Sequence, residues 1–172
     1  MPMSPWRCRS GECEFLDFNI TSEAVPENAL EALNDVFPEG LCAIEIYPLE
    51  DGGMKVGAIA WSQYRITWGF EDAVPAGFTD AVRALFARPA VEIVKRSKRG
   101  EKTVNMKELM RGLTITEGAD EVTAVVTTAA GNNNMSPEYL TRAIAQYLPQ
   151  YEIPFSAYHR MNVFTADGTP FR

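Results

Sequence analysis

The chain of 172 residues contains little histidine and little cysteine, which narrows the chemistry that it can perform. His159 is its only histidine, and Cys8, Cys13 and Cys42 are its only cysteines. An odd number of cysteines does not form a complete disulfide framework, and a zinc site at Cys8 and Cys13 needs two further ligands. We therefore expect a reducing compartment, no metal and no cofactor.

Long apolar runs are also missing. No stretch approaches the ~18 apolar residues that would indicate a membrane span. The N-terminus, Met-Pro-Met-Ser-Pro-Trp-Arg, lacks the basic-then-apolar layout of a secretory signal. The hydrophobic content of 46% and the charged content of 23% are typical of a soluble globular protein with a packed core. We expect a cytoplasmic protein that has no membrane partner.

The sequence contains none of the short motifs that mark common active sites. It has no P-loop, no Gly-rich dinucleotide turn, no G-x-S-x-G nucleophile motif and no H-E-x-x-H zinc motif. His159 stands in "AYHRMNVF", where no nucleophile accompanies it, so we interpret it as a structural residue. We expect Trp61, Tyr64 and Trp68 to be core residues rather than a platform for stacking bases. These features favour a protein that is not an enzyme.

Hydrophobic periodicity predicts an α+β fold. Helices are predicted where apolar residues recur at helical spacing, at 25–40, 76–89 and 136–150. Strands are predicted at 14–20, 41–49, 54–70, 90–97, 102–106 and 153–164, with a hairpin at 113–130. The first six elements run β-α-β-β-α-β, the order of the ferredoxin-like motif, and a second, smaller α+β half follows. We expect a single domain over 1–172 with halves at about 11–97 and 98–172.

Positive charge is concentrated in residues 94–111, which hold seven basic and two acidic side chains. This run has a net charge of +5, whereas the rest of the chain carries −12. Gly100 favours a turn between the strands at 90–97 and 102–106, because glycine adopts positive φ easily. Both faces of the tip are charged, so we expect the hairpin to project into solvent. Its base is predicted to be anchored by Val91, Ile93, Val104 and Met106.

Two interpretations of this basic hairpin remain open. It is either a solvated element whose lysines discourage edge-to-edge pairing, or a contact site for an anionic partner. That partner is either RNA, through its phosphates, or an acidic protein surface. The strongly acidic remainder of the chain argues against a protein that coats nucleic acid broadly. The candidate contact residues are Lys95, Arg96, Lys98, Arg99 and Lys102.

Several stretches together resemble the radical SAM-linked proteins, which carry the domain of unknown function DUF2344. They are "GECEFLDFNI" (11–20), "LEALNDVFPEGLCAIEI" (30–46), "SQYRITW" (62–68), "VEIVKRSKRGEKTVNMKELM" (91–110) and "SPEYLTRAI" (136–144). The family shows a Glu-Tyr-Leu-Asp-like strand, which reads Glu14-Phe15-Leu16-Asp17 here. Its Val-Asp-Ile-Arg-like segment reads Val104-Asn105-Met106-Lys107 here. Family members also have a longer N-terminal part with a Gly-Phe-Asn-Pro-His-Pro-like motif, so this chain resembles a shortened form.

The resemblance implies a role beside a radical SAM protein, because the family is encoded next to such proteins or fused to them. This chain lacks the Cys-x3-Cys-x2-Cys motif that holds the iron–sulfur cluster of a radical SAM enzyme. We therefore expect a non-catalytic accessory protein that has a radical SAM protein as its partner and presents an RNA or a protein substrate. The alternative is an independent RNA-binding module linked to tRNA or ribosome maturation.

Overall fold

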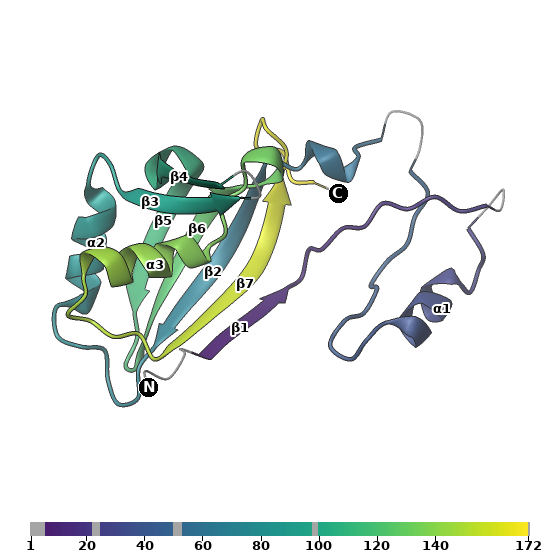
Figure 1. Ribbon diagram of the computed structural model, residues 1–172. Coiled ribbons are helices and arrows are strands. Elements are labelled where there is room, and N and C mark those ends of the chain that lie inside the picture. The colour runs from purple at the N-terminus through teal and green to yellow at the C-terminus, as the bar shows by residue number, and fades with distance from the viewer. Residues whose placement is uncertain (1–5, 22–24, 50–52, 98–99, 172) are drawn as a thin grey trace. The chain divides into compact units, whose positions relative to one another are not determined.

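The computed structural model describes residues 6–21, 25–49, 53–97 and 100–171 (Figure 1). The chain divides into two compact units, each of which is described by itself. Unit 1 comprises Met1–Glu14 and Gly57–Arg172, and unit 2 comprises Phe15–Val56. Their boundaries are not those of the predicted halves, and the single domain stays a prediction. No helix in the described part of the chain combines the length and the apolar character needed to cross a bilayer.

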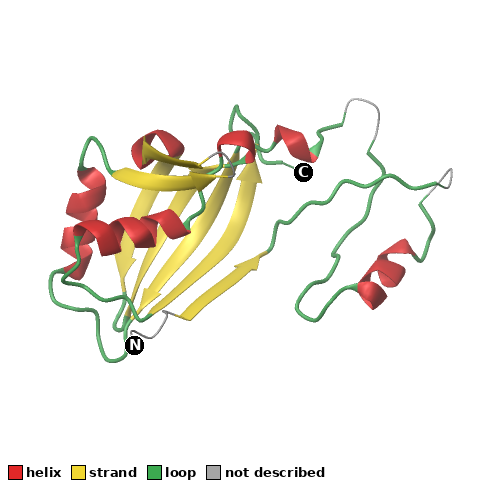
Figure 2. Cartoon of the chain, viewed as in Figure 1, coloured by secondary structure: helices red, strands yellow, loops and turns green. Residues whose placement is uncertain are grey.

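Unit 1 is built on a five-stranded sheet with the strand order β1-β7-β2-β6-β5. β1 runs parallel to β7, and the other neighbouring strands are antiparallel. The strands are β1 (Trp6–Gly11), β2 (Trp61–Gly69), β5 (Met110–Glu117), β6 (Glu121–Ala129) and β7 (Phe155–Phe164). One face of this sheet is covered by two helices and a hairpin (Figure 2). These are α2 (Phe78–Ala87), α3 (Glu138–Tyr147) and the pair β3 (Glu92–Ser97) and β4 (Gly100–Asn105).

The elements β2, α2, β5, β6, α3 and β7 follow one another in a β-α-β-β-α-β order. β2 and β5 are both antiparallel to β6, so α2 connects two parallel strands that are separated by a third. In the same way, α3 connects β6 and β7 across β2. The β3–β4 hairpin and the 3₁₀ helix Met106–Leu109 lie between α2 and β5 in the chain.

The α+β class is therefore confirmed, and the ferredoxin-like order predicted within 11–97 is not. The described residues of 14–20 and 41–49 belong to no strand, although both segments were predicted to be strands. The strand predicted at 90–97 does form, but it pairs with β4 in a separate two-stranded sheet. The helices predicted at 76–89 and 136–150, and the hairpin predicted at 113–130, are present as α2, α3 and β5–β6.

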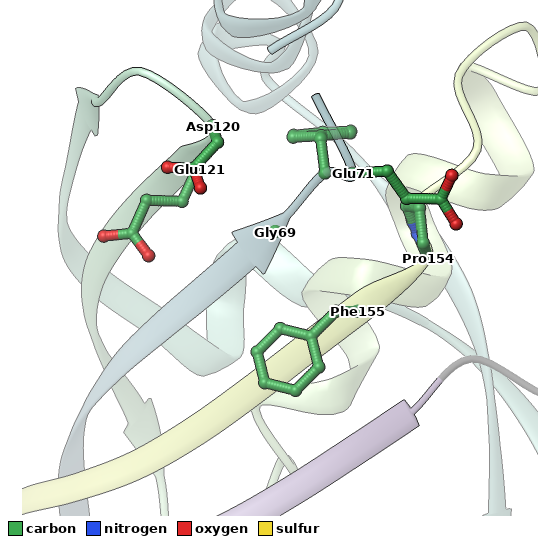
Figure 3. Close-up of a pocket in the computed structure, with 7 residues that line it drawn as sticks. Gly69, Glu71, Asp120, Glu121, Pro154 and Phe155 are labelled. Atoms are coloured by element: carbon green, nitrogen blue, oxygen red, sulfur yellow. The ribbon is translucent and has the colours of Figure 1, made fainter. Parts of the chain in front are cut away.

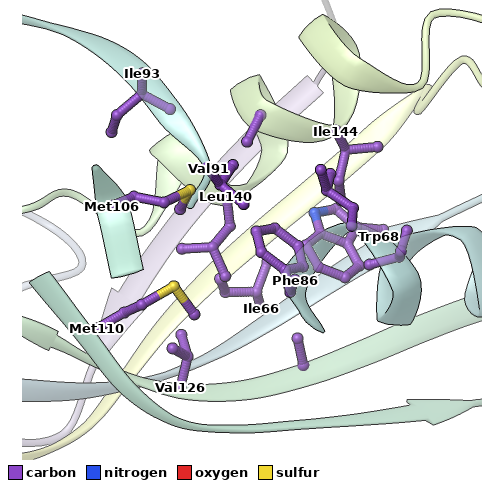
Figure 4. Close-up of a cluster of buried hydrophobic side chains, with 14 of the residues drawn as sticks. Ile66, Trp68, Phe86, Val91, Ile93, Met106, Met110, Val126, Leu140 and Ile144 are labelled. Atoms are coloured by element: carbon purple, nitrogen blue, oxygen red, sulfur yellow. The ribbon is translucent and has the colours of Figure 1, made fainter. Parts of the chain in front are cut away.

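The core of unit 1 lies between the sheet and its covering elements (Figure 4). Successive side chains of a strand point to opposite faces, so Ile66 and Trp68 of β2 are fully buried while Arg65 is exposed. The Trp68 ring packs edge-on against Phe78 of α2, with 6.3 Å between ring centroids. Its indole nitrogen donates a hydrogen bond to Thr141 Oγ1 of α3 at 2.8 Å. The apolar face predicted for 76–89 is confirmed, because all of its members are buried: Phe78, Val82, Leu85 and Phe86.

Unit 2 contains α1 (Ala29–Val36), within the helix predicted at 25–40, and loop segments on either side of it. None of its described side chains is buried. Hydrogen bonds connect the segments of unit 2 instead. The Asn34 side chain forms two hydrogen bonds with the backbone of Ala43, at 2.6 and 3.1 Å, and Asp17 Oδ2 accepts one from the Val56 amide at 2.9 Å.

Two isoleucine substitutions test whether the buried core lies in unit 1 and not in unit 2. Ile66→Ala should lower the free energy of unfolding by about 2–5 kcal/mol, because it leaves a cavity in the core of unit 1. Ile44→Ala in unit 2, where the side chain is 77% exposed, should change it by less than about 0.5 kcal/mol. Chemical denaturation of both variants measures this, and equal losses would contradict the assignment of the core.

Candidate functional site

The basic hairpin forms as predicted, with β3 and β4 antiparallel. Gly100 has a φ of +114°, a conformation that L side chains rarely adopt, which explains why glycine suits this turn. Val91, Ile93 and Met106 at the base are buried, and Val104 is partly buried against the core. The predicted anchoring of the base is therefore confirmed.

Hydrogen bonds fix the base of the hairpin in addition to its apolar contacts. Asn105 Oδ1 accepts from the amides of Val91 and Lys107, each at 3.1 Å. Both of these hydrogen bonds go to the side-chain oxygen of Asn105, an acceptor that a carboxylate also offers, as in the Val-Asp-Ile-Arg-like family segment. Tyr147 of α3 donates its hydroxyl to the Glu92 carbonyl and accepts from the Glu92 amide, both at 3.1 Å. The base of the hairpin is therefore fixed by Asn105 to the residues on either side of the hairpin, and by Tyr147 to α3.

The five predicted contact residues are placed to different extents. Lys95 pairs with Lys102 across the strands, and Arg96 pairs with Glu101. Lys102 is exposed, whereas Lys95 is half-buried and its Nζ lies 3.5 Å from Asn133 Oδ1. The side chain of Arg96 and the whole of Lys98 and Arg99 lie outside the described residues. The projection of the tip into solvent therefore stays a prediction.

A second polar cluster lies on the sheet face opposite the helices, where β1 meets β7. Ser10 Oγ lies 2.8 Å from His159 Nδ1, and Glu12 Oε1 lies 3.2 Å from His159 Nε2. The register pairs Ser10 with His159 and His159 with Arg65, so Arg65 neighbours the cluster on the same face. Sequence reasoning missed this cluster, because 149 residues separate Ser10 from His159. The one available signal was the i, i+2 spacing of Ser10 and Glu12, which suits one face of an extended chain.

A serine, a histidine and a carboxylate in a row resemble the relay that activates a nucleophile. Such a relay also needs a site that holds a reacting carbonyl beside the hydroxyl and donors for the developing charge. Glu12 is 77% exposed at its side chain, so the cluster is open to water. Its two contacts connect β1 with β7 at the edge of the sheet. We assign it that structural role.

The opposite face of β1 is also tied to its neighbours. Arg9 donates to Glu138 in the first turn of α3, and this hydrogen bond raises the pKa of the Arg9 guanidinium. Arg160 of β7 donates to Glu14, and its Nε donates to the Tyr64 hydroxyl at 3.1 Å. These ion pairs tie β1 to α3 and the segment that follows β1 to β7.

A pocket of about 350 Å³ lies where β7 begins (Figure 3). It is lined by Gly69, Phe70, Glu71, Asp120, Glu121, Pro154 and Phe155. A side chain at Gly69 would meet the Phe155 ring at 3.1 Å, so glycine allows the ring to lie against β2. Among the residues that the structure describes, no group of three or more histidine, cysteine or acidic side chains is placed to hold a metal ion.

The family described as "Uncharacterized protein conserved in bacteria (DUF2344)" matches residues 9–137, about three quarters of the chain. The chain therefore belongs to the DUF2344 family. The matched range includes the whole basic hairpin, whereas His159 lies beyond it. Neither curated proteins nor solved structures gave a match. The DUF2344 part of the resemblance is confirmed, and the link to radical SAM proteins stays a prediction.

Replacing His159 by alanine tests the role of the cluster at the sheet edge. Loss of its contacts with Ser10 and Glu12, at about 1 kcal/mol each and about 2 kcal/mol together, should speed amide hydrogen exchange in β1 by about 30-fold. Arg65→Ala, on the neighbouring strand and the same face, serves as the control and should leave β1 unchanged. Exchange in β1 that is equal in both variants would contradict the assigned role.

The two cysteines whose side chains the structure describes, Cys13 and Cys42, should differ in reactivity. Burial raises the pKa of the Cys13 thiol, so less reactive thiolate is present at pH 8, and its sulfur lies 3.8 Å from the Arg160 carbonyl. Cys42 is exposed. In a Cys8→Ser background, iodoacetamide should modify Cys42 at least ~10-fold faster than Cys13, as followed by peptide mass spectrometry. Equal rates would show that Cys13 is not shielded.

Proposed function

We propose that this protein is a non-catalytic accessory protein of the cytoplasm that works with a radical SAM enzyme and presents an RNA or a protein substrate to it. The basic hairpin β3–β4 is its contact element. In this proposal residues 61–164 are a ferredoxin-like domain, and the hairpin is an insertion that carries the contact.

The observation that carries the proposal is a cationic tip on a rigid base. Residues 95–102 hold five basic side chains and one acidic side chain. The base is fixed by buried Val91, Ile93 and Met106 and by the hydrogen bonds of Asn105 and Tyr147. Because the base is already fixed, less conformational entropy is lost when the hairpin binds a partner. This favours a contact site over a solvated element that only discourages edge-to-edge pairing.

The choice of a radical SAM enzyme as partner rests on the family resemblance described above. The same tip also favours the second candidate function, an independent RNA-binding module. Five phosphate contacts to single-stranded RNA would give a log–log dependence of affinity on salt with a slope of about −3.5. A partner protein bound mainly through shape and apolar contacts would show a weaker dependence.

Reversal of the tip charge tests the proposal. The variant Lys95→Glu, Arg96→Glu, Lys98→Glu and Arg99→Glu should retain at least ~10-fold less partner than the unaltered chain, because attraction becomes repulsion. The control reverses four basic residues outside the tip: Arg65, Arg83, Arg88 and Arg142. Both variants change the net charge equally, and both are first checked for an unchanged thermal transition. Tagged protein is then used to retain partners from native lysate with and without RNase.

The outcomes separate the two candidate functions. A radical SAM protein retained after RNase, and lost only with the tip variant, supports the accessory role. RNA recovered without such a protein supports the RNA-binding module. Retention that is unaffected by the tip variant would overturn both, because both require the hairpin.

A further inference from the structure

Among the residues that the structure describes, exposed hydrophobic side chains are concentrated in unit 2, residues 15–56. We call this unit the acidic arm. Eleven large hydrophobic side chains of the described chain are exposed, and nine of them belong to the arm. They are Leu16, Phe18, Ile20, Val36, Leu41, Ile44, Tyr47, Leu49 and Met54. Exposed hydrophobic side chains gathered in one segment of the chain favour a site of interaction, whereas single scattered ones would need no explanation.

The arm also has a very uneven charge. It contains nine acidic residues and one basic residue, Lys55, which gives a formal net charge of −8. Unit 1, with fifteen basic and fourteen acidic residues, is nearly neutral. The negative charge of the whole chain, −7, is therefore a property of the arm.

Charge limits the occupants that this apolar surface can accept. Nucleic acids and anionic lipid surfaces repel a segment that carries −8. A second arm from another copy of the chain repels it for the same reason. We propose that the acidic arm docks a protein partner whose contact surface is both apolar and cationic. This site is separate from the basic hairpin, and it does not depend on the function proposed for the hairpin.

The acidic arm contains segments outside any helix or strand, against which a segment of a partner protein can pack. Leu16, Phe18 and Ile20 alternate with Asp17 and Asn19, so they share one side where the chain is extended. No described residue of 13–21 or 41–49 is part of a strand, and these segments flank α1. A partner strand or amphipathic helix would cover the apolar side chains, and its lysines and arginines would face the carboxylates.

Three synthetic peptides test the proposal on the full chain. The first is a fourteen-residue amphipathic peptide of leucine and lysine. The second has serine in place of leucine, and the third has glutamate in place of lysine. Fluorescence anisotropy should show binding of the leucine–lysine peptide at least ~10-fold tighter than either of the others, because both apolar and charged contacts contribute. Hydrogen exchange should show protection within residues 15–56.

Matched variants locate the binding surface. The triple variant Leu16→Ser, Val36→Ser and Ile44→Ser changes side chains that are 72, 75 and 77% exposed, so it should not affect the core. This variant should bind the leucine–lysine peptide about ten-fold more weakly, or weaker still, than the unaltered chain does. The control, Val94→Ser with Phe155→Ser, changes two large hydrophobic side chains outside the arm that are exposed in the described structure, and it should bind the peptide normally. The tip variant Lys95→Glu, Arg96→Glu, Lys98→Glu and Arg99→Glu should also bind this peptide at least as well as the unaltered chain.

Three results would overturn the proposal. Equal binding of the lysine–serine peptide would show that charge alone is responsible. Protection outside residues 15–56 would place the site elsewhere. The third result is a dimer in analytical ultracentrifugation whose acidic arm is protected from hydrogen exchange. If that protection is lost when the charge of the basic tip is reversed, the occupant is the hairpin of a second copy of the chain. None of these results decides the role of the hairpin in retaining its own partner.

Discussion

Trp68 joins the central strand β2 to both helices that cover the sheet. Its ring is fully buried and packs edge-on against Phe78 of α2. Its indole nitrogen donates to Thr141 of α3, and the Tyr158 hydroxyl of β7 donates to the same oxygen at 2.8 Å. A buried indole N–H and a buried phenol each need a partner, and Thr141 supplies it for both. The position of α3 in turn fixes the hairpin, because Tyr147 binds the backbone of β3.

The sequence predicts the elements that bury an apolar face against this core. The spacing of Phe78, Val82, Leu85 and Phe86 predicts α2, and Gly100 predicts the hairpin turn. β1 was not predicted, because Trp6 and Cys8 are the only apolar residues of "WRCRSG" and are too few to establish an alternation. Its place at the edge of the sheet depends on backbone pairing with β7 and on ion pairs such as Arg9–Glu138, which sequence spacing does not reveal.

The two incorrectly predicted strands show the limit of periodicity more clearly. Alternation at 14–20 and the apolar residues of 41–49 predicted two strands with apolar side chains to be covered. Periodicity does not say what covers them, and within unit 2 nothing described does. The β-α-β-β-α-β order was consequently assigned to 11–97, whereas it belongs to β2, α2, β5, β6, α3 and β7. The cluster of Ser10, Glu12 and His159 was equally inaccessible, because it depends on the pairing of distant strands.

The structure thus separates the buried core from the acidic, hydrophobic surface that we propose as a contact site. Unit 1 holds the buried core and fixes a cationic hairpin, whereas unit 2 holds most of the exposed hydrophobic side chains among the described residues and all of the excess negative charge. Two surfaces of opposite charge on one chain are suited to two different partners. This arrangement is what an accessory protein needs if it is to bring two molecules together.

Native-state hydrogen exchange of the free protein tests this separation most directly. If stability resides in unit 1, the amides of β2, β6, β7 and α3 should exchange only through near-global unfolding, at about 5–15 kcal/mol. The amides of α1, which lacks buried side chains, should exchange at least ~1000-fold faster than those of α3. Protection of α1 equal to that of α3 would contradict the account, because the arm would then be part of the stable core.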